Sequence, residues 1–130
     1  MPVLDGWTAI AAVAALTSRV RLGTLVTGVT HRNPAVLAKM AATLDHVSAG
    51  RAVLGLGAAW NEDEHWAYGI PFGPIGERLG LLDEACQVVR SLFEREVTTF
   101  EGTAPSATRS SSPSRSRPGC RSSSAAAESG

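Results

Sequence analysis

Apolar and polar residues are arranged along the first hundred positions in two alternating patterns, one helical and one typical of strands. Apolar residues recur at helical spacing over residues 7–19, and Asp5 precedes them as a candidate N-cap. Residues 20–27 are nearly all apolar or β-branched and end at Gly28, as expected of a strand covered on both faces. The sequence therefore predicts a helix followed by a buried strand.

The same alternation continues towards the C-terminus. Asn33 and Pro34 form the N-cap and first position of a predicted second helix. A short apolar run over residues 52–57 predicts a second buried strand, and residues 60–73 are interpreted as a long connection. Residues 76–95 predict the clearest helix, with acidic side chains early and arginines late. This order predicts right-handed βαβ packing around a parallel sheet.

The pattern breaks after Gly102. Residues 103–130 are rich in Ser, Arg, Pro and Ala and contain almost no large apolar side chains. Such a composition cannot bury enough apolar surface to offset the entropy lost on ordering. We therefore divide the chain into an α/β domain, residues 1–102, and a tail, residues 103–130, that is expected to be disordered.

Charge and cysteine content exclude several classes of partner. Twelve Lys and Arg residues balance twelve Asp and Glu residues, so there is no electrostatic reason to expect nucleic acid or an anionic membrane. Cys86 and Cys120 lack metal-type spacing, which favours a reduced, cytoplasmic protein without disulfides. The apolar run over residues 10–16 is far shorter than the ~20 residues that span a bilayer. Neither a membrane helix nor a signal peptide is expected.

Three features suggest chemistry but have simpler interpretations. Residues 55–60 resemble a dinucleotide fingerprint, but Trp60 stands where that motif needs glycine, so a Rossmann site is excluded. Residues 62–65 are Glu, Asp, Glu and His, a cluster that suggests a metal site or an acid–base pair. The simpler interpretation is the start of a helix, where the helix dipole stabilises acidic side chains. His31 follows the first strand and either lines a pocket or, more simply, lies in an exposed loop; His46 near a helix end is interpreted as structural.

Residues 19–27 (RVRLGTLVT) and 33–45 (NPAVLAKMAATLD) closely resemble the luciferase-like monooxygenase superfamily. The likeness continues through residues 55–61, 68–72 and 76–79, and it is similar to the branch that uses the deazaflavin coenzyme F-420. Members of this superfamily are TIM-like barrels of roughly 250 residues or more, with the active site at the carboxyl ends of the strands. The resemblance implies an α/β fold: a partial TIM-like (β/α)8 barrel of about two β/α units, plus the disordered tail.

The resemblance also implies cofactor contacts at the end of the first strand. Val26, Thr27 and Gly28 would place backbone and small side chains against a flavin-type ring. Relatives often have a non-proline cis peptide in this segment, a feature usually confined to functional sites. The alternative is an ordinary strand end with Gly28 as a turn residue.

By the same resemblance, the loop after the second strand lies beside the cofactor. Gly57, Ala58, Trp60 and Asn61 are the expected cofactor-binding residues, with Asn61 as a polar contact. Ala59 stands where relatives commonly have glycine, so a close backbone approach is less secure there. No nucleophile, general base or metal ligand is assigned.

The function implied is an oxidoreductase that transfers a hydride from reduced F-420 to a small organic substrate. An FMN-dependent monooxygenase of the same fold is the alternative. Since strands of the complete barrel are absent, the chain is expected to be an inactive fragment. A second alternative is therefore a non-enzymatic remnant that associates with itself through barrel faces left uncovered.

The tail itself carries a further hypothesis. After Gly102 the family pattern expects an aromatic segment, then Glu-Pro-Lys-Pro-Val-Gln, then a strand ending in glycines. In a shifted reading frame, residues 111–117 permit that hexapeptide and residues 124–129 permit Gly-Gly-Gly-Gly-Glu. We therefore predict a frameshift near residues 102–104, the alternative being a natural Ser/Arg tail.

Overall fold

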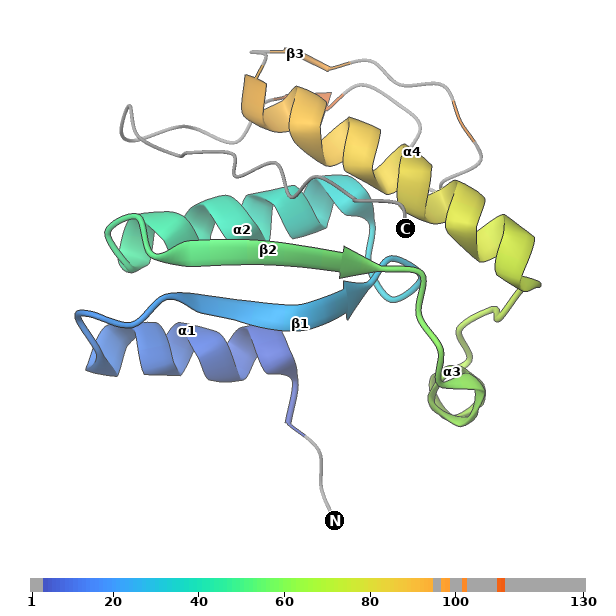
Figure 1. The fold of residues 1–130 in the computed structure, drawn as a ribbon, viewed down its shortest axis with the longest axis horizontal. Coiled ribbons are helices and arrows are strands. Elements are labelled where there is room, and N and C mark those ends of the chain that lie inside the picture. The colour runs from blue at the N-terminus through green and yellow to red at the C-terminus, as the bar shows by residue number, and fades with distance from the viewer. Residues whose placement is uncertain (1–3, 95–96, 99–101, 103–109, 112–130) are drawn as a thin grey trace, which may run out of the picture.

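Two parallel strands joined by a helix form the centre of the molecule. The computed structural model describes residues 4–94, 97–98, 102 and 110–111. Strand β1 (Leu22–Gly28) pairs in parallel with β2 (Ala52–Gly57), and helix α2 (Pro34–Val47) connects them (Figure 1). The register pairs Gly28 with Gly57, so both strands end at the same edge of the sheet. The predicted βαβ arrangement is confirmed.

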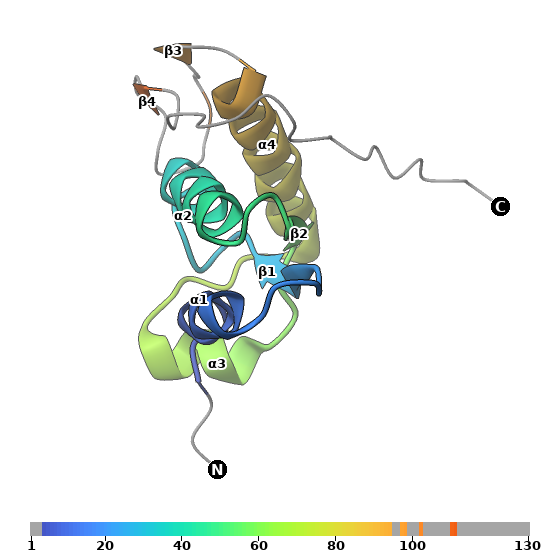
Figure 2. The ribbon, with the colours of Figure 1, turned by 90° about the vertical axis from the view of Figure 1, so that its left-hand side faces the viewer.

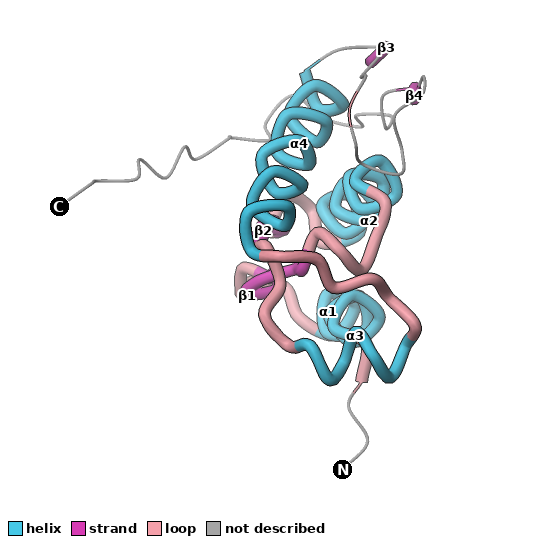
Figure 3. Tube along the Cα trace, turned by 90° about the vertical axis from the view of Figure 1, so that its right-hand side faces the viewer, coloured by secondary structure: helices cyan, strands magenta, loops and turns pink. Residues whose placement is uncertain are grey.

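Helices cover one face of this sheet. Helix α1 (Gly6–Leu16) and α2 pack on the same face, and α4 (Ile75–Glu94) packs against α2 and the end of β2, as the two end-on views show (Figures 2 and 3). The core consists of buried apolar residues from these elements: Trp7, Ala14, Leu22, Leu37, Ala41, Leu44, Val88, Val89 and Leu92. On the other face, which no described helix covers, Leu25 is 100% exposed and Val53 is 41% exposed.

The helix starts follow the capping chemistry of the sequence. Asp5 Oδ1 accepts a hydrogen bond from the Thr8 backbone N–H at 2.9 Å, and Asn33 Oδ1 accepts one from Ala35 at 2.9 Å. Both predicted N-caps are confirmed. Helix α4 begins one residue earlier than predicted, at Ile75.

The connection predicted over residues 60–73 contains a helix that we did not expect as a separate element. Helix α3 (Glu62–Tyr68) starts at the N-cap Asn61 and ends at Gly69, which has the left-handed φ of 66°. Seven residues are too few for a helical period to stand out from an irregular pattern. The acidic residues at positions 62–64 occupy its first turn, which confirms the helix-start interpretation.

Arg51 closes the amino edge of the sheet, where both strands begin. Its guanidinium donates hydrogen bonds to the backbone carbonyls of Ala14 (3.0 Å), Thr17 (2.8 Å) and Val20 (2.8 Å), and its Nε to that of Ser48 (2.7 Å). Since three of these carbonyls belong to the end of α1 and the turn after it, the arginine fixes where that helix stops. Helix α1 therefore ends at Leu16 rather than at the predicted residue 19.

The C-terminal predictions fall mostly outside the described residues. A short antiparallel pair joins β3 (Val97–Thr98) to β4 (Ser110–Ser111), so these two serines differ from the disorder expected from residue 103 on. The remainder of the tail, the proposed frameshift and the predicted helix end at residue 95 lie outside the described residues. Among the described helices, none is both long enough and apolar enough to cross a membrane.

Candidate functional site

The predicted cofactor residues gather at the carboxyl edge of the sheet. Gly28 and Gly57 pair there; the loop that leaves β1 at this edge turns back into α2, and the loop that leaves β2 runs to α3 (Figure 1). In open and closed parallel α/β folds, ligands bind at this edge because the loops after the strands surround it. The structure thus brings the two predicted segments together.

The Val26 side chain lies flat across β2 because glycines leave room for it. A Cβ added at Gly57 would stand 2.5 Å from Val26 Cγ2, and one added at Gly55 would stand 3.0 Å from Val26 Cγ1. Val26 is still 51% exposed, so its outer surface faces the uncovered side of the sheet. The peptide bond between Leu25 and Val26 is cis and non-proline, beside the segment where the resemblance implied one. We call Val26, Gly55 and Gly57 the valine platform.

Thr27 points away from this platform. It is buried, its hydroxyl accepts the Trp7 indole N–H at 3.0 Å, and it shares a hydrogen bond with the Thr24 hydroxyl at 2.6 Å. Its side chain therefore ties β1 to α1, and only its backbone borders the uncovered face. No local pattern predicts this partnership, since Trp7 lies 20 residues away from Thr27 along the chain.

The loop after β2 is held by a buried arginine that the sequence reasoning missed. Arg78 donates to the backbone carbonyls of Ala58 (3.3 Å) and Ala59, and its Nε donates to that of Gly73 (3.0 Å). Its guanidinium lies 4.0 Å from the centre of the Phe72 ring. Ala59 has φ of 63°, which explains why glycine suits this position in relatives. The signal available was the arginine within the family-like stretch at residues 76–79.

Trp60 and Asn61 have different roles in the structure. Trp60 is 84% exposed at the same edge. Asn61 begins α3: its side-chain oxygen accepts from the Glu64 backbone N–H, and its carbonyl lies 2.6 Å from His65 Nδ1. Its cap role is structural, so the expected polar contact with a cofactor stays a prediction, as do the cofactor contacts of the other residues named from the resemblance.

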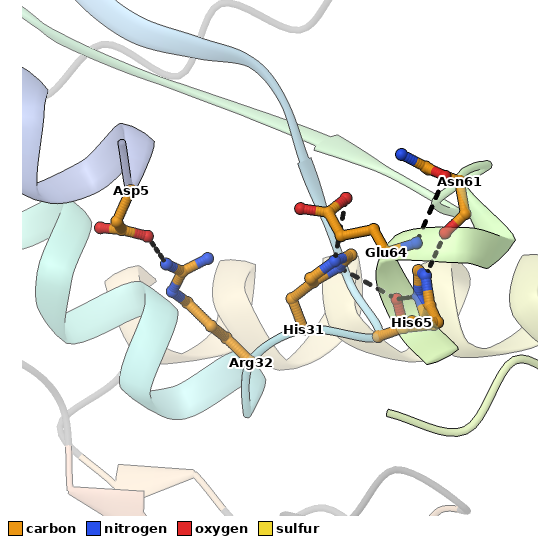
Figure 4. Close-up of polar contacts among 7 residues, drawn as sticks. Asp5, His31, Arg32, Asn61, Glu64 and His65 are labelled. Atoms are coloured by element: carbon orange, nitrogen blue, oxygen red, sulfur yellow. Dashed lines mark hydrogen bonds and ion pairs between the residues drawn. The ribbon is translucent and has the colours of Figure 1, made fainter. Parts of the chain in front are cut away.

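Two histidines connect the loops (Figure 4). His65 is fully buried, and its Nε2 lies 2.7 Å from the Thr30 hydroxyl. The His31 ring packs edge-on against it, with 4.5 Å between centroids, and His31 Nε2 lies 3.6 Å from a Glu64 carboxylate oxygen. Since only 19% of the His31 side chain is exposed, it is half-buried rather than the exposed loop residue that the sequence favoured.

Other candidate chemistry is weaker. Among the described residues, no group of His, Cys, Asp and Glu side chains could hold a metal ion. A cavity of about 380 Å³ lies between α3 and the segment that follows it, lined by Glu62, His65, Trp66 and residues 69–72. Partial burial, with the nearby Asp83 carboxylate, raises the pKa of the Cys86 thiol, which disfavours a reactive thiolate.

The chain is similar to known proteins both in sequence and in structure. A family profile described as luciferase-like monooxygenase matches residues 2–126. An F-420-dependent glucose-6-phosphate dehydrogenase of Kineococcus radiotolerans is 47% identical over 93 residues, covering 69% of this chain and 27% of the relative. An uncharacterised protein of Mycobacterium tuberculosis is 40% identical over 102 residues (78% and 35%), and the pyrimidine monooxygenase RutA of Escherichia coli is 35% identical over 101 residues (76% and 30%). The chain spans about a third of the length of these relatives.

Solved structures give the same picture. The monooxygenase RslO1 from Streptomyces bottropensis matches with a TM-score of 0.72 and 33% identity, covering 91% of this chain and 34% of that one. The oxygenating constituent of 3,6-diketocamphane monooxygenase from Pseudomonas putida, a Baeyer–Villiger enzyme in complex with FMN, matches with a TM-score of 0.67. The latter is 23% identical, covers 85% of this chain and 30% of that one, and supports the fold alone. The predicted fold class, a partial TIM-like barrel, is confirmed.

Proposed function

Because the chain belongs to the luciferase-like monooxygenase family, we propose that the valine platform is one wall of a cofactor pocket in an oxidoreductase. In that enzyme, reduced coenzyme F-420 transfers a hydride to a small organic substrate. The observation that carries this proposal is the Val26 side chain lying across Gly55 and Gly57 at the carboxyl edge of the sheet. Such an edge is where parallel α/β enzymes bind their ligands.

The residues present fit a flat, largely apolar ring system. The platform is apolar and half-exposed, and neither glycine adds a side chain above the sheet. Arg78 holds the carbonyls of Ala58 and Ala59, so the loop bordering the platform keeps its shape without a ligand. Preorganisation of this kind lowers the entropy lost on binding. The coenzyme supplies the hydride chemistry, and the protein supplies the wall that positions it.

The coenzyme is proposed as F-420, with FMN as the alternative. A relative at 47% identity is named for its dependence on F-420, which favours the deazaflavin. A structural neighbour in complex with FMN keeps a monooxygenase reaction as the second candidate. Since the chain spans about a third of its relatives, we propose that it binds either cofactor weakly and does not turn over substrate alone.

Titration of the chain with F-420 and, separately, with FMN tests the proposal, with the polarisation of ligand fluorescence as the readout. We expect saturable binding, tighter for F-420. The Val26→Glu variant places a carboxylate on the platform and should lose binding at least 10-fold. Val47→Glu is the matched control, because Val47 is similarly exposed (54%) but lies at the opposite edge. Equal binding by both variants would place the ligand elsewhere.

Self-association is the competing function, and the uncovered face of the sheet favours it. Leu25 and Val53 are exposed on that face, and apolar surface of this kind drives contact with a second copy of the chain. Sedimentation analysis should then show dimers that Val53→Lys returns to monomers. Since Val53 pairs with Gly23, away from the carboxyl edge, this variant should keep any F-420 binding. The two functions are thereby separated.

A further inference from the structure

The chain turns at the end of α3, and the segment that then leads to α4 encloses a cavity against the helix (Figure 3). Gly69 has a left-handed φ of 66°, and the Ile70 backbone N–H donates to the His65 carbonyl at 2.8 Å. The Phe72 ring packs edge-on against the His65 ring, with 4.7 Å between centroids. Residues 70–72 are therefore held beside the helix. The cavity between them, about 380 Å³, has a size that suits a small organic molecule.

The lining of this cavity combines one carboxylate with aromatic and apolar groups. Glu62 and Trp66 are four residues apart in α3, so they are neighbours on one face of the helix, and both line the cavity. Both are exposed, Trp66 to 81%. The segment after α3 adds apolar surface from Ile70, Pro71 and Phe72. None of the lining residues belongs to the valine platform, so the cavity is separate from the proposed cofactor wall.

The Glu62 carboxylate has no cationic partner among the residues that the structure describes. The ion pairs of that part of the chain use the carboxylates of Asp5 and Glu64 instead. Residues 61–78 contain four acidic side chains and a single basic one, Arg78, whose guanidinium donates to backbone carbonyls. The surroundings of the cavity therefore carry an excess of negative charge, which attracts cations from solution.

We propose that this cavity binds a small organic cation of the alkylated ammonium class, held by the Glu62 carboxylate and the Trp66 indole. A carboxylate attracts the positive charge, and the face of an indole attracts it as well while covering the alkyl groups. Among the described residues, no group of His, Cys, Asp and Glu side chains could hold a metal ion, so an organic cation suits the cavity better than a metal. The site does not depend on the proposed binding of F-420.

Titration of the 130-residue chain with choline tests the proposal, with nitrogen-15 NMR of the three tryptophan indole N–H groups as the readout. At constant ionic strength we expect a saturable shift of the Trp66 signal. The Trp7 indole, which is buried against Thr27, should not respond. The uncharged analogue 3,3-dimethylbutan-1-ol has carbon in place of the ammonium nitrogen, and it should bind at least about 10-fold more weakly. Equal binding of the two compounds, or no saturable shift with choline, overturns the proposal.

Two pairs of variants test which side chains hold the cation, with saturation transfer to the choline methyl protons as the readout. Glu62→Gln keeps the shape but removes the charge, and it should weaken choline binding about 10-fold. Asp63→Asn is its matched control, because Asp63 makes the same change of charge on the same helix but does not line the cavity. Trp66→Leu should also weaken binding, whereas Tyr68→Leu, at an exposed aromatic residue outside the cavity, should not. Equal losses within either pair would mean attraction to the acidic helix as a whole and would overturn the site.

Discussion

At each edge of the sheet an arginine side chain donates hydrogen bonds to several backbone carbonyls, but the two edges have different roles. At the amino edge, Arg51 donates to four backbone carbonyls and joins the end of α1 to the turn before β2. At the carboxyl edge, Arg78 donates to three backbone carbonyls and stacks on Phe72. In each case a guanidinium supplies the donors that irregular backbone needs.

The edges differ in what remains accessible once the arginine is in place. Arg51 draws the connections at its edge together, and no candidate ligand residue lies among its partners. Arg78 holds only the loop after β2, so the valine platform and Trp60 stay exposed beside it. In barrels of this type the amino-terminal face serves stability and the carboxyl-terminal face serves chemistry. Each edge should therefore respond differently to substitution.

The largest expected effect is at the amino edge. Arg51→Ala leaves several carbonyls without their donor, and we expect a loss of about 2–4 kcal/mol in the free energy of unfolding. Since a two-stranded sheet is marginal, this loss should unfold much of the population. Urea denaturation followed by circular dichroism measures it. Arg51→Lys should rescue little, because one ammonium cannot reach divergent carbonyls.

Arg21→Ala is the matched control for this prediction, since Arg21 is exposed and directly precedes β1 at the same edge. It should change stability by less than about 0.5 kcal/mol. Arg78→Ala extends the contrast: it should lower stability and also weaken F-420 binding, because the loop at residues 58–59 loses its anchor. If Arg51→Ala weakens binding at unchanged stability, the division of labour between the edges is wrong.

The second expected effect is confined to the carboxyl edge. Gly57→Ala puts a methyl group against Val26 Cγ2, so Val26 must move, which should cost about 1–3 kcal/mol and lower F-420 affinity roughly 10-fold. Val26→Ala in the same chain makes room for that methyl group. The double variant should therefore recover stability relative to Gly57→Ala, giving a coupling energy above about 0.5 kcal/mol in a double-mutant cycle. Strict additivity would mean that the platform packing is not as described.

Local chemistry explains which elements could be predicted. The start of α2 follows from Asn33 as N-cap and Pro34 at the first position, both of which act within one turn. Strand β2 follows from a compact apolar run over Ala52–Gly57. These signals need no knowledge of the rest of the chain, so the observed bounds agree with the predicted ones.

Distant contacts explain what could not be predicted. The end of α1 is set by Arg51, which lies 34 residues from its partner Thr17. Glycines in β2 were visible, but the sequence does not show that they make room for Val26 from another strand. Burial of Arg78 and His65 likewise depends on how two loops meet. Strand ends and resemblance therefore placed the predicted residues at one edge of the sheet, where their cofactor contacts stay a prediction, while the polar framework around them was missed.

A smaller effect compares two alanines, one at each edge. Ala49 and Ala59 both have left-handed φ, 56° and 63°, which costs a residue with a Cβ about 1 kcal/mol. Ala49→Gly and Ala59→Gly should each raise the free energy of unfolding by no more than about 0.5 kcal/mol, because the greater entropy of unfolded glycine offsets most of the relieved strain. Only Ala59→Gly should alter F-420 affinity. A change in affinity with Ala49→Gly would contradict the assignment of edges.

The smallest expected effect concerns the charge of Asp5, which pairs with Arg32 in the loop after β1. The Thr8 backbone N–H, aided by the Thr8 hydroxyl and by Arg32, holds the pKa of Asp5 below its ordinary value of 3.8. A lowered folded pKa means that the stabilisation is complete above the unfolded pKa and is lost as the pH falls below it. Asp5→Asn keeps the N-cap acceptor but removes the charge, so it should cost less than about 1 kcal/mol at neutral pH, given the exposure of the pair. Urea titrations from about pH 7 to pH 3 should show the two proteins converging only below about pH 4. If the two proteins still differ in their free energy of unfolding at pH 3, the substitution acts through the shape of the side chain and not through its charge. The ion pair between Asp5 and Arg32 would then contribute nothing to stability at the carboxyl edge.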